Sequence, residues 1–228
     1  MLDEPISVLD VSGRKNSNRG KIFYGISSVP DIGIVQENFN NHSNDNGNVD
    51  NLHEVLGCIE IKNIDSDIKK SKLIDSLQSV LEKIKNNTYK KADNSYFIDE
   101  QEYIGFTGVD IEQLLRQVLW YRKVLYTNGK EWKYFEVVFS NENSKSQYLV
   151  DIKEFSYSEN SEDYKKYKDG KKTIDRTWFR RLSNAGDGVK WIQNVNIYEE
   201  NLFLESDYNR SDEQAWSELK NSIRMKFV

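Results

Sequence analysis

The segment 55–63, with the sequence VLGCIEIKN, carries an acidic and a basic residue inside an otherwise apolar run. Successive side chains of a β-strand point to opposite faces of its sheet. A strand in this segment therefore places Glu60 and Lys62 on one face, while Ile59 and Ile61 point to the other. The Glu60 carboxylate and the Lys62 ammonium group are thus expected to be neighbours on that face.

A second acidic residue, Asp31, follows Pro30 and begins another β-prone run, IGIV. If the two strands pair, Asp31 and Glu60 converge at one end of the sheet, with Lys62 alongside. Two carboxylates suit Mg²⁺, which prefers oxygen ligands, and the Ile59 carbonyl is a candidate third ligand. A lysine beside such an ion positions the attacking water and offsets negative charge at phosphorus. These residue types predict phosphodiester hydrolysis with Mg²⁺, or Mn²⁺ in its place.

The elements that must position these residues follow from local patterns. Polar residues rich in Asn and Gly at 40–51 indicate a loop between strands. Apolar residues at helical spacing predict a helix over 71–86, and Asn128-Gly129 between β-prone runs predicts a hairpin with a type I′ turn. Strands are expected at 21–27, 31–39, 53–63 and 147–155, and a helix at 212–227. This order predicts an α/β fold with a mixed central sheet flanked by helices.

A second helix carries three polar residues on one stripe. Asp110 and Gln113 form a capping box that predicts the start of this helix, which ends near Lys123. Gln113, Gln117 and Tyr121 follow one another at intervals of one turn. Two interpretations stand level: an ordinary polar helix face, or a face on which Gln117 reaches a phosphate or an active-site water.

Three motifs together resemble the PD-(D/E)xK nuclease superfamily with a Gln-x-x-x-Tyr helix. They are Pro30-Asp31, the segment EIK from Glu60 to Lys62, and the segment QVLWY from Gln117 to Tyr121. The segment VLYTNGKEW is similar to the stretch after that helix in the N-terminal nuclease domains of type I restriction motor subunits. The similarity covers roughly residues 21–139. It implies a restriction-endonuclease-like core in which Asp31 and Glu60 bind the metal, Lys62 acts on the nucleophile or phosphate, and Gln117 supports them.

Rival patterns exist elsewhere in the chain. Asp151 and Lys153 repeat the acidic-x-Lys spacing, but they follow the hairpin and have no Pro-Asp at a suitable distance upstream. Asp50 is a rival metal ligand within the Asn-rich loop, and Glu4 is an early acidic residue that such sites often use. For Glu60 and Lys62 the alternative is a salt-bridged pair on a solvated strand face.

We expect residues 1–156 to form the nuclease-like core and residues 157–228 an extension packed on it that binds substrate or a partner. Within the extension, Arg176, Arg180 and Arg181 flank Trp178 and Phe179, and Arg180 and Arg181 are candidate phosphate contacts. Together with Gln113 and Tyr121 they are the predicted substrate-binding residues. A helix that buries its aromatics and solvates its arginines explains the same residues.

Composition bounds the remaining choices. The 228-residue chain has a formal net charge of -5, one cysteine and two histidines, so it has neither an internal disulfide nor the ligands for a Cys/His zinc site. Without an apolar run of membrane-spanning length or a signal-like N-terminus, we expect a cytoplasmic protein.

The sequence predicts a Mg²⁺-dependent DNA endonuclease, with RNA as another possible substrate and a homodimer expected by analogy. The alternative is a catalytically inactive nuclease-fold module that binds nucleic acid or a protein, which the acidic net charge favours.

Overall fold

The structure, a computed structural model, describes twelve parts of the chain. They are residues 6–11, 30–37, 39, 49–62, 77–86, 88, 96–98, 101–103, 108–129, 131–157, 190–203 and 213–227. The strand predicted at 21–27 lies outside these residues, as do Glu4, Arg180 and Arg181.

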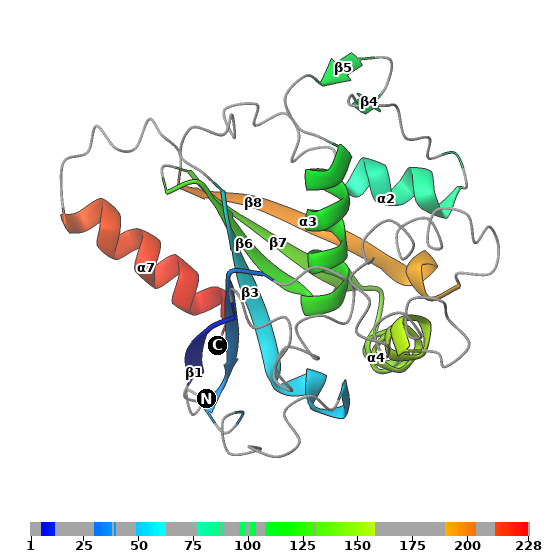
Figure 1. Ribbon diagram of the computed structural model, residues 1–228, viewed down its shortest axis with the longest axis horizontal. Helices are drawn as coiled ribbons and strands as arrows, with labels where there is room; N and C mark the ends of the chain where they lie inside the picture. The colour runs from blue at the N-terminus through cyan, green and yellow to red at the C-terminus, as the bar shows by residue number, and fades with distance from the viewer. Residues whose placement is uncertain are drawn as a thin grey trace.

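A six-stranded sheet occupies the centre of the structure, in the order β1-β2-β3-β6-β7-β8 (Figure 1). Neighbouring strands are antiparallel except β3 and β6, which run parallel. The strands are β1 (Ile6–Asp10), β2 (Ile32–Gln36), β3 (Val55–Ile61), β6 (Lys123–Thr127), β7 (Trp132–Phe139) and β8 (Val195–Phe203). A separate two-stranded sheet pairs β4 (Tyr96–Ile98) with β5 (Gln101–Tyr103). The predicted α/β class with a mixed sheet is confirmed.

Four α-helices of the described residues cover the two faces of this sheet. They are α2 (Leu77–Lys85), α3 (Gly108–Tyr121), α4 (Glu142–Tyr157) and α7 (Glu213–Phe227). In Figure 1, α7 lies on one side of the strands and α2, α3 and α4 lie on the other. Parallel strands require a long connection, and here α2 and α3 lie within the crossover from β3 to β6. Among the described residues, no helix is long and apolar enough to cross a membrane.

Two hydrophobic cores follow from the alternation of side chains across the sheet. The larger core lies under α2, α3 and α4 and contains Cys58, Leu115 and Phe135. The smaller core lies under α7, where the Phe227 ring meets Tyr134 edge to face at a centroid distance of 6.0 Å. A Cβ atom on Gly57 would lie 2.4 Å from Phe227 Cε1, so glycine allows α7 to pack this closely.

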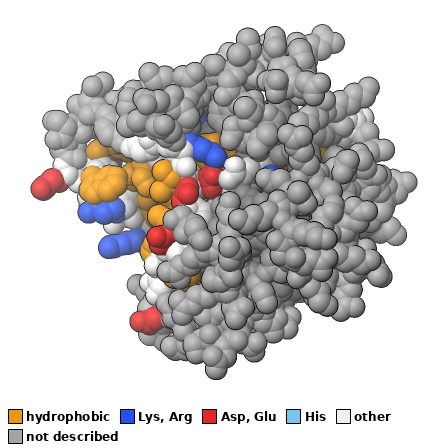
Figure 2. Space-filling model, viewed as in Figure 1, with side chains coloured by type: hydrophobic (Ala, Val, Ile, Leu, Met, Phe, Trp, Pro, Cys, Tyr) orange, Lys and Arg blue, Asp and Glu red, His pale blue; other side chains and the backbone are white. Residues whose placement is uncertain are grey.

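The outer surface of α7 is partly apolar. Trp216 is 53% exposed and Met225 is 80% exposed, whereas Leu219 is buried against the rest of the molecule. Figure 2 shows hydrophobic side chains on this side of the molecule, next to Lys, Arg, Asp and Glu side chains.

Near the end of α7, Lys123 Nζ donates to the Lys226 carbonyl oxygen at 2.5 Å. This hydrogen bond joins the C-terminal end of α7 to the first residue of β6.

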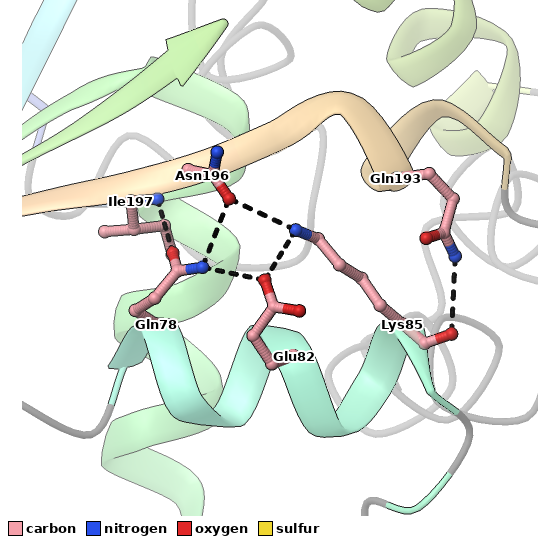
Figure 3. Close-up of polar contacts among 6 residues, drawn as sticks. All are labelled: Gln78, Glu82, Lys85, Gln193, Asn196 and Ile197. Atoms are coloured by element: carbon pink, nitrogen blue, oxygen red, sulfur yellow. Dashed lines mark hydrogen bonds and ion pairs between the residues drawn. The ribbon is translucent and has the colours of Figure 1, made fainter. Parts of the chain in front are cut away.

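Side chains of α2 bind the edge strand β8 (Figure 3). The Ile197 N–H donates to Gln78 Oε1 at 2.6 Å, and Gln78 Nε2 donates to Glu82 Oε1 at 2.8 Å. Lys85 Nζ contacts the same Glu82 oxygen at 2.7 Å and Asn196 Oδ1 at 3.4 Å. An edge strand presents backbone groups that another chain can bind, and Gln78 satisfies one of them internally.

The predicted hairpin of β6 and β7 is confirmed, but its predicted type I′ turn is wrong. Thr127 lies opposite Trp132, so four residues connect the strands instead of two. Gly129 has a positive φ of 86°, whereas Asn128 does not. Asn128 Oδ1 instead accepts a hydrogen bond from the Glu131 N–H at 2.8 Å. Asn128 therefore serves as an acceptor in a longer loop and does not supply the positive φ that a type I′ turn needs.

The strand predicted at 147–155 is wrong, because these residues lie in α4. Asn141 Oδ1 accepts from the Ser144 N–H at 2.8 Å, which caps the helix. Tyr148 and Ile152, one turn apart, are both buried. The helical spacing of these residues and the cap decide the conformation. Asp151 and Lys153 both lie on this helix, where residues two apart do not share a face. Their acidic-x-Lys spacing therefore does not place them side by side, as it would on a strand.

Three further differences concern boundaries. The end of the predicted loop at 40–51 forms the start of a 3₁₀ helix, η2 (Val49–Glu54), which includes Asp50. A second 3₁₀ helix, η5 (Lys190–Asn194), precedes β8. Helix α3 begins at Gly108, so Asp110 is its third residue and the predicted cap there is wrong. The Gln113 side chain therefore does not form the predicted capping box with Asp110.

Candidate functional site

Glu60 is the centre of the candidate site. It is the sixth residue of β3 and is only 5% exposed. Like Cys58 two residues earlier, which belongs to the larger core, it points to the face covered by α3. A buried carboxylate is stable only when other groups satisfy its oxygens.

Three side chains bind the Glu60 carboxylate. Lys62 Nζ lies 2.8 Å from Oε1, and Gln113 Nε2 donates to the same oxygen at 2.7 Å. Gln117 Nε2 donates to Oε2, also at 2.7 Å. Lys62 Nζ additionally donates to Gln113 Oε1 at 3.3 Å. The predicted acidic residue, lysine and two glutamines thus form one hydrogen-bonded cluster.

Helix α3 places both glutamines over the strand. Leu114, Leu115, Val118 and Leu119 belong to the larger core and fix how the helix lies on the sheet. Residues four apart lie one turn from each other on the same helix face, so both amides reach one carboxylate. Gln117 is fully buried and therefore faces the protein interior.

Asp31 lies immediately before β2, at the same end of the sheet. Ile32 pairs with Ile59 in the antiparallel register, which places Asp31 opposite Glu60 one step further along. The Ile61 N–H donates to Asp31 Oδ2 at 2.7 Å, so the backbone of β3 holds this side chain. The predicted convergence of the two strands at this end is present.

Burial governs the electrostatics of the site. Desolvation raises the pKa of Glu60 above its ordinary value, and the nearby Asp31 charge acts in the same direction. The positive charge of Lys62 and hydrogen bonds from Lys62 and Gln117 oppose this rise without cancelling it. The pKa of the Cys58 thiol is also raised, first by burial and then by the charges of Glu60 and Asp31. Negative charge from both carboxylates therefore acts on the same small region.

Two residues next to this cluster were not predicted. Tyr126 pairs with Glu60 in the parallel register, and the centroid of its ring lies 5.9 Å from Lys62 Nζ. Lys133 pairs with Tyr126 in the hairpin and is only 1% exposed. Alternation along β7 puts Lys133 on the same face as Phe135, a residue of the larger core, but it does not by itself tell which face the helices cover.

The residues present fit a hard divalent cation. An ionised carboxylate offers about four lone-pair positions, and the three donors to Glu60 leave room for one metal bond. Asp31 accepts the Ile61 N–H and also retains acceptor capacity. Among the described residues, no group of three or more His, Cys, Asp or Glu side chains surrounds a metal position. Mg²⁺ commonly binds through one or two carboxylates and keeps several waters.

The other predicted residues have different positions. Ile59 lies in the ladder beside Ile32, and its side chain packs against the smaller core. Its carbonyl as a metal ligand stays a prediction. Tyr121 is fully buried in the larger core, where it packs against the sheet, and its contact with substrate likewise stays a prediction. The side chain of Asp50 is outside the described set, as are Glu4, Arg180 and Arg181.

Comparison of the chain with protein-family models, with curated proteins and with solved structures finds no match.

Proposed function

We propose that the chain is a metal-dependent nuclease of the PD-(D/E)xK type that hydrolyses phosphodiester bonds in DNA. The observation that carries the proposal is the arrangement around Glu60. Asp31 lies opposite it across β2 and β3, Lys62 binds one of its oxygens at 2.8 Å, and two amides of α3 complete its contacts. The aspartate after Pro30, the Glu60-Lys62 pair and Gln117 thus lie near one end of β3.

The topology supports the same proposal. Antiparallel β2 and β3 carry the two carboxylates, and a helical crossover leads from β3 to the parallel strand β6. The resemblance to restriction-like nucleases implies a carboxylate on one strand, Glu-x-Lys on the next and a glutamine on a later helix. Each part of this expectation has a counterpart here.

The proposed roles follow from chemistry and position. A divalent cation, when bound, would polarise a phosphoryl oxygen and acidify a coordinated water. Asp31 and Glu60 would hold this cation. Lys62 is positioned to orient the attacking water or to offset charge on the phosphate, while Gln117 holds the Glu60 carboxylate in place.

Cleavage of supercoiled plasmid and of single-stranded DNA, with Mg²⁺ or Mn²⁺, tests the proposal. We expect cleavage by the wild type and a loss of about 100-fold or more in Lys62→Ala and in Glu60→Ala. Gln147→Leu, which removes an exposed amide on α4, is the matched control and should retain activity. No cleavage by the wild type, or equal cleavage by all four proteins, would refute the enzymatic proposal. A parallel assay on single-stranded RNA decides between the two nucleic acids.

A second candidate is an inactive nuclease-fold module that binds nucleic acid or a protein. The net charge of -5 favours it, because an independent DNA enzyme gains from a basic surface. In addition, Lys62 already supplies a positive charge to Glu60, as a cation would. Titration with Mn²⁺ separates the two: a nuclease should bind it saturably and lose this binding in Asp31→Ala, whereas an inactive module should not bind it.

A further inference from the structure

The side chain of Gln113 lies between two oppositely charged groups. Its Nε2 donates to Glu60 Oε1 at 2.7 Å, and its Oε1 accepts from Lys62 Nζ at 3.3 Å. Lys62 Nζ is itself 2.8 Å from the same Glu60 oxygen. The three groups therefore close a triangle of polar contacts. Gln113 is one turn before the Gln117-to-Tyr121 spacing and is not a member of that motif.

Only a neutral amide satisfies both neighbours at this position. Its donor end must face the carboxylate and its acceptor end must face the ammonium group. A lysine here would repel Lys62, and an apolar side chain would leave both contacts unmade. Gln117 differs, because its amide donates to the opposite oxygen, Glu60 Oε2.

The triangle has a consequence for cation binding, which rests on the proposed function. A cation bound to the Glu60 carboxylate would compete with the positively charged Lys62 for its negative charge. The contact of Lys62 with Gln113 Oε1 does not use a carboxylate oxygen, and the centroid of the Tyr126 ring lies 5.9 Å from Lys62 Nζ. We propose that Gln113 is a positioning residue that holds Lys62 beside Glu60 and retains it there when a cation binds this carboxylate.

The test measures how firmly Lys62 is held, independently of nuclease activity. The full chain is acetylated with N-acetoxysuccinimide at fixed pH, and the rate at Lys62 is read by mass spectrometry relative to Lys85. With saturating Mn²⁺, Gln113→Met should raise the Lys62 rate about tenfold, because a hydrogen bond to a charged group is lost. Gln113→Glu keeps an acceptor for Lys62 and adds a negative charge beside it, so it should not raise the Lys62 rate. Gln117→Met should change the rate by less than about twofold.

A second arm needs no cation. Glu60→Gln removes the carboxylate charge that anchors Lys62, and adding Gln113→Met should again raise the Lys62 rate about tenfold. Equal rates with and without Gln113→Met in this background would overturn the proposal, as would a Gln117→Met effect equal to that of Gln113→Met. A wild type that binds no Mn²⁺ would refute the proposed function alone, because this arm still decides the role of Gln113.

Discussion

Replacing Lys62 with methionine removes the positive charge from a largely buried ion pair while keeping a side chain of similar length. The Lys62 and Glu60 side chains are 18% and 7% exposed, so water replaces little of the lost interaction. Removing one partner of a buried pair costs about 3 to 5 kcal/mol. Because two amide donors still bind Glu60, we expect the lower end, a fall of about 3 kcal/mol in the free energy of unfolding at pH 7.

The pH dependence of this loss of stability tests whether the missing Lys62 charge causes it. The folded-state pKa of Glu60 is already raised, and it should rise further once Lys62 is gone. Protonation then favours the folded variant as the pH falls through this raised pKa towards the ordinary value of 4.5. Urea unfolding should show the deficit of Lys62→Met shrinking over this interval. In a Glu60→Gln background, Lys62→Met should destabilise the protein far less. An equal deficit at pH 7 and pH 4, or in both backgrounds, would refute the electrostatic reasoning.

Three further substitutions test the surrounding fold. Gly57→Ala should lower the free energy of unfolding by about 2 kcal/mol or more, because the new Cβ would lie 2.4 Å from Phe227 Cε1. Gly129→Ala has open space around the new Cβ, so it should lower this free energy by only about 1 kcal/mol, the strain of its positive φ. Urea unfolding of both variants checks this, and a smaller effect at Gly57 than at Gly129 would contradict the packing of α7. Gln78→Leu should destabilise the protein by about 1 to 3 kcal/mol, because the Ile197 N–H loses its acceptor, and hydrogen exchange at that amide should accelerate; unchanged exchange would contradict the role of α2 at this edge.

The sequence predicted the parts of the site that depend on strand and helix periodicity. Period-two alternation alone placed Glu60 and Lys62 on one face, and the structure has them in contact. Spacing of one helical turn placed Gln113 and Gln117 on one stripe, and both donate to the same carboxylate. These relations are local, so they survive any error in the arrangement of distant elements.

The remaining errors arose where tertiary contacts or side-chain caps decide the conformation. The segment around Asp151 has residues that suit a strand, but the Asn141 cap and the burial of Tyr148 and Ile152 favour a helix. The position of Lys133 depends on which face of β7 meets the helices, and β7 alone does not reveal this. Gln113 seemed suited to a capping box because its spacing from Asp110 is correct, yet the helix begins two residues earlier.

Binding of Mn²⁺ to the purified full chain tests the central claim most directly, because it requires neither the correct substrate nor its sequence. Isothermal titration should show saturable binding by the wild type and a loss of about tenfold or more in affinity in both Asp31→Ala and Glu60→Ala, with Gln147→Leu unchanged. Affinity that is equal in the wild type and in the two carboxylate variants, or no binding at all, would contradict a metal site between β2 and β3.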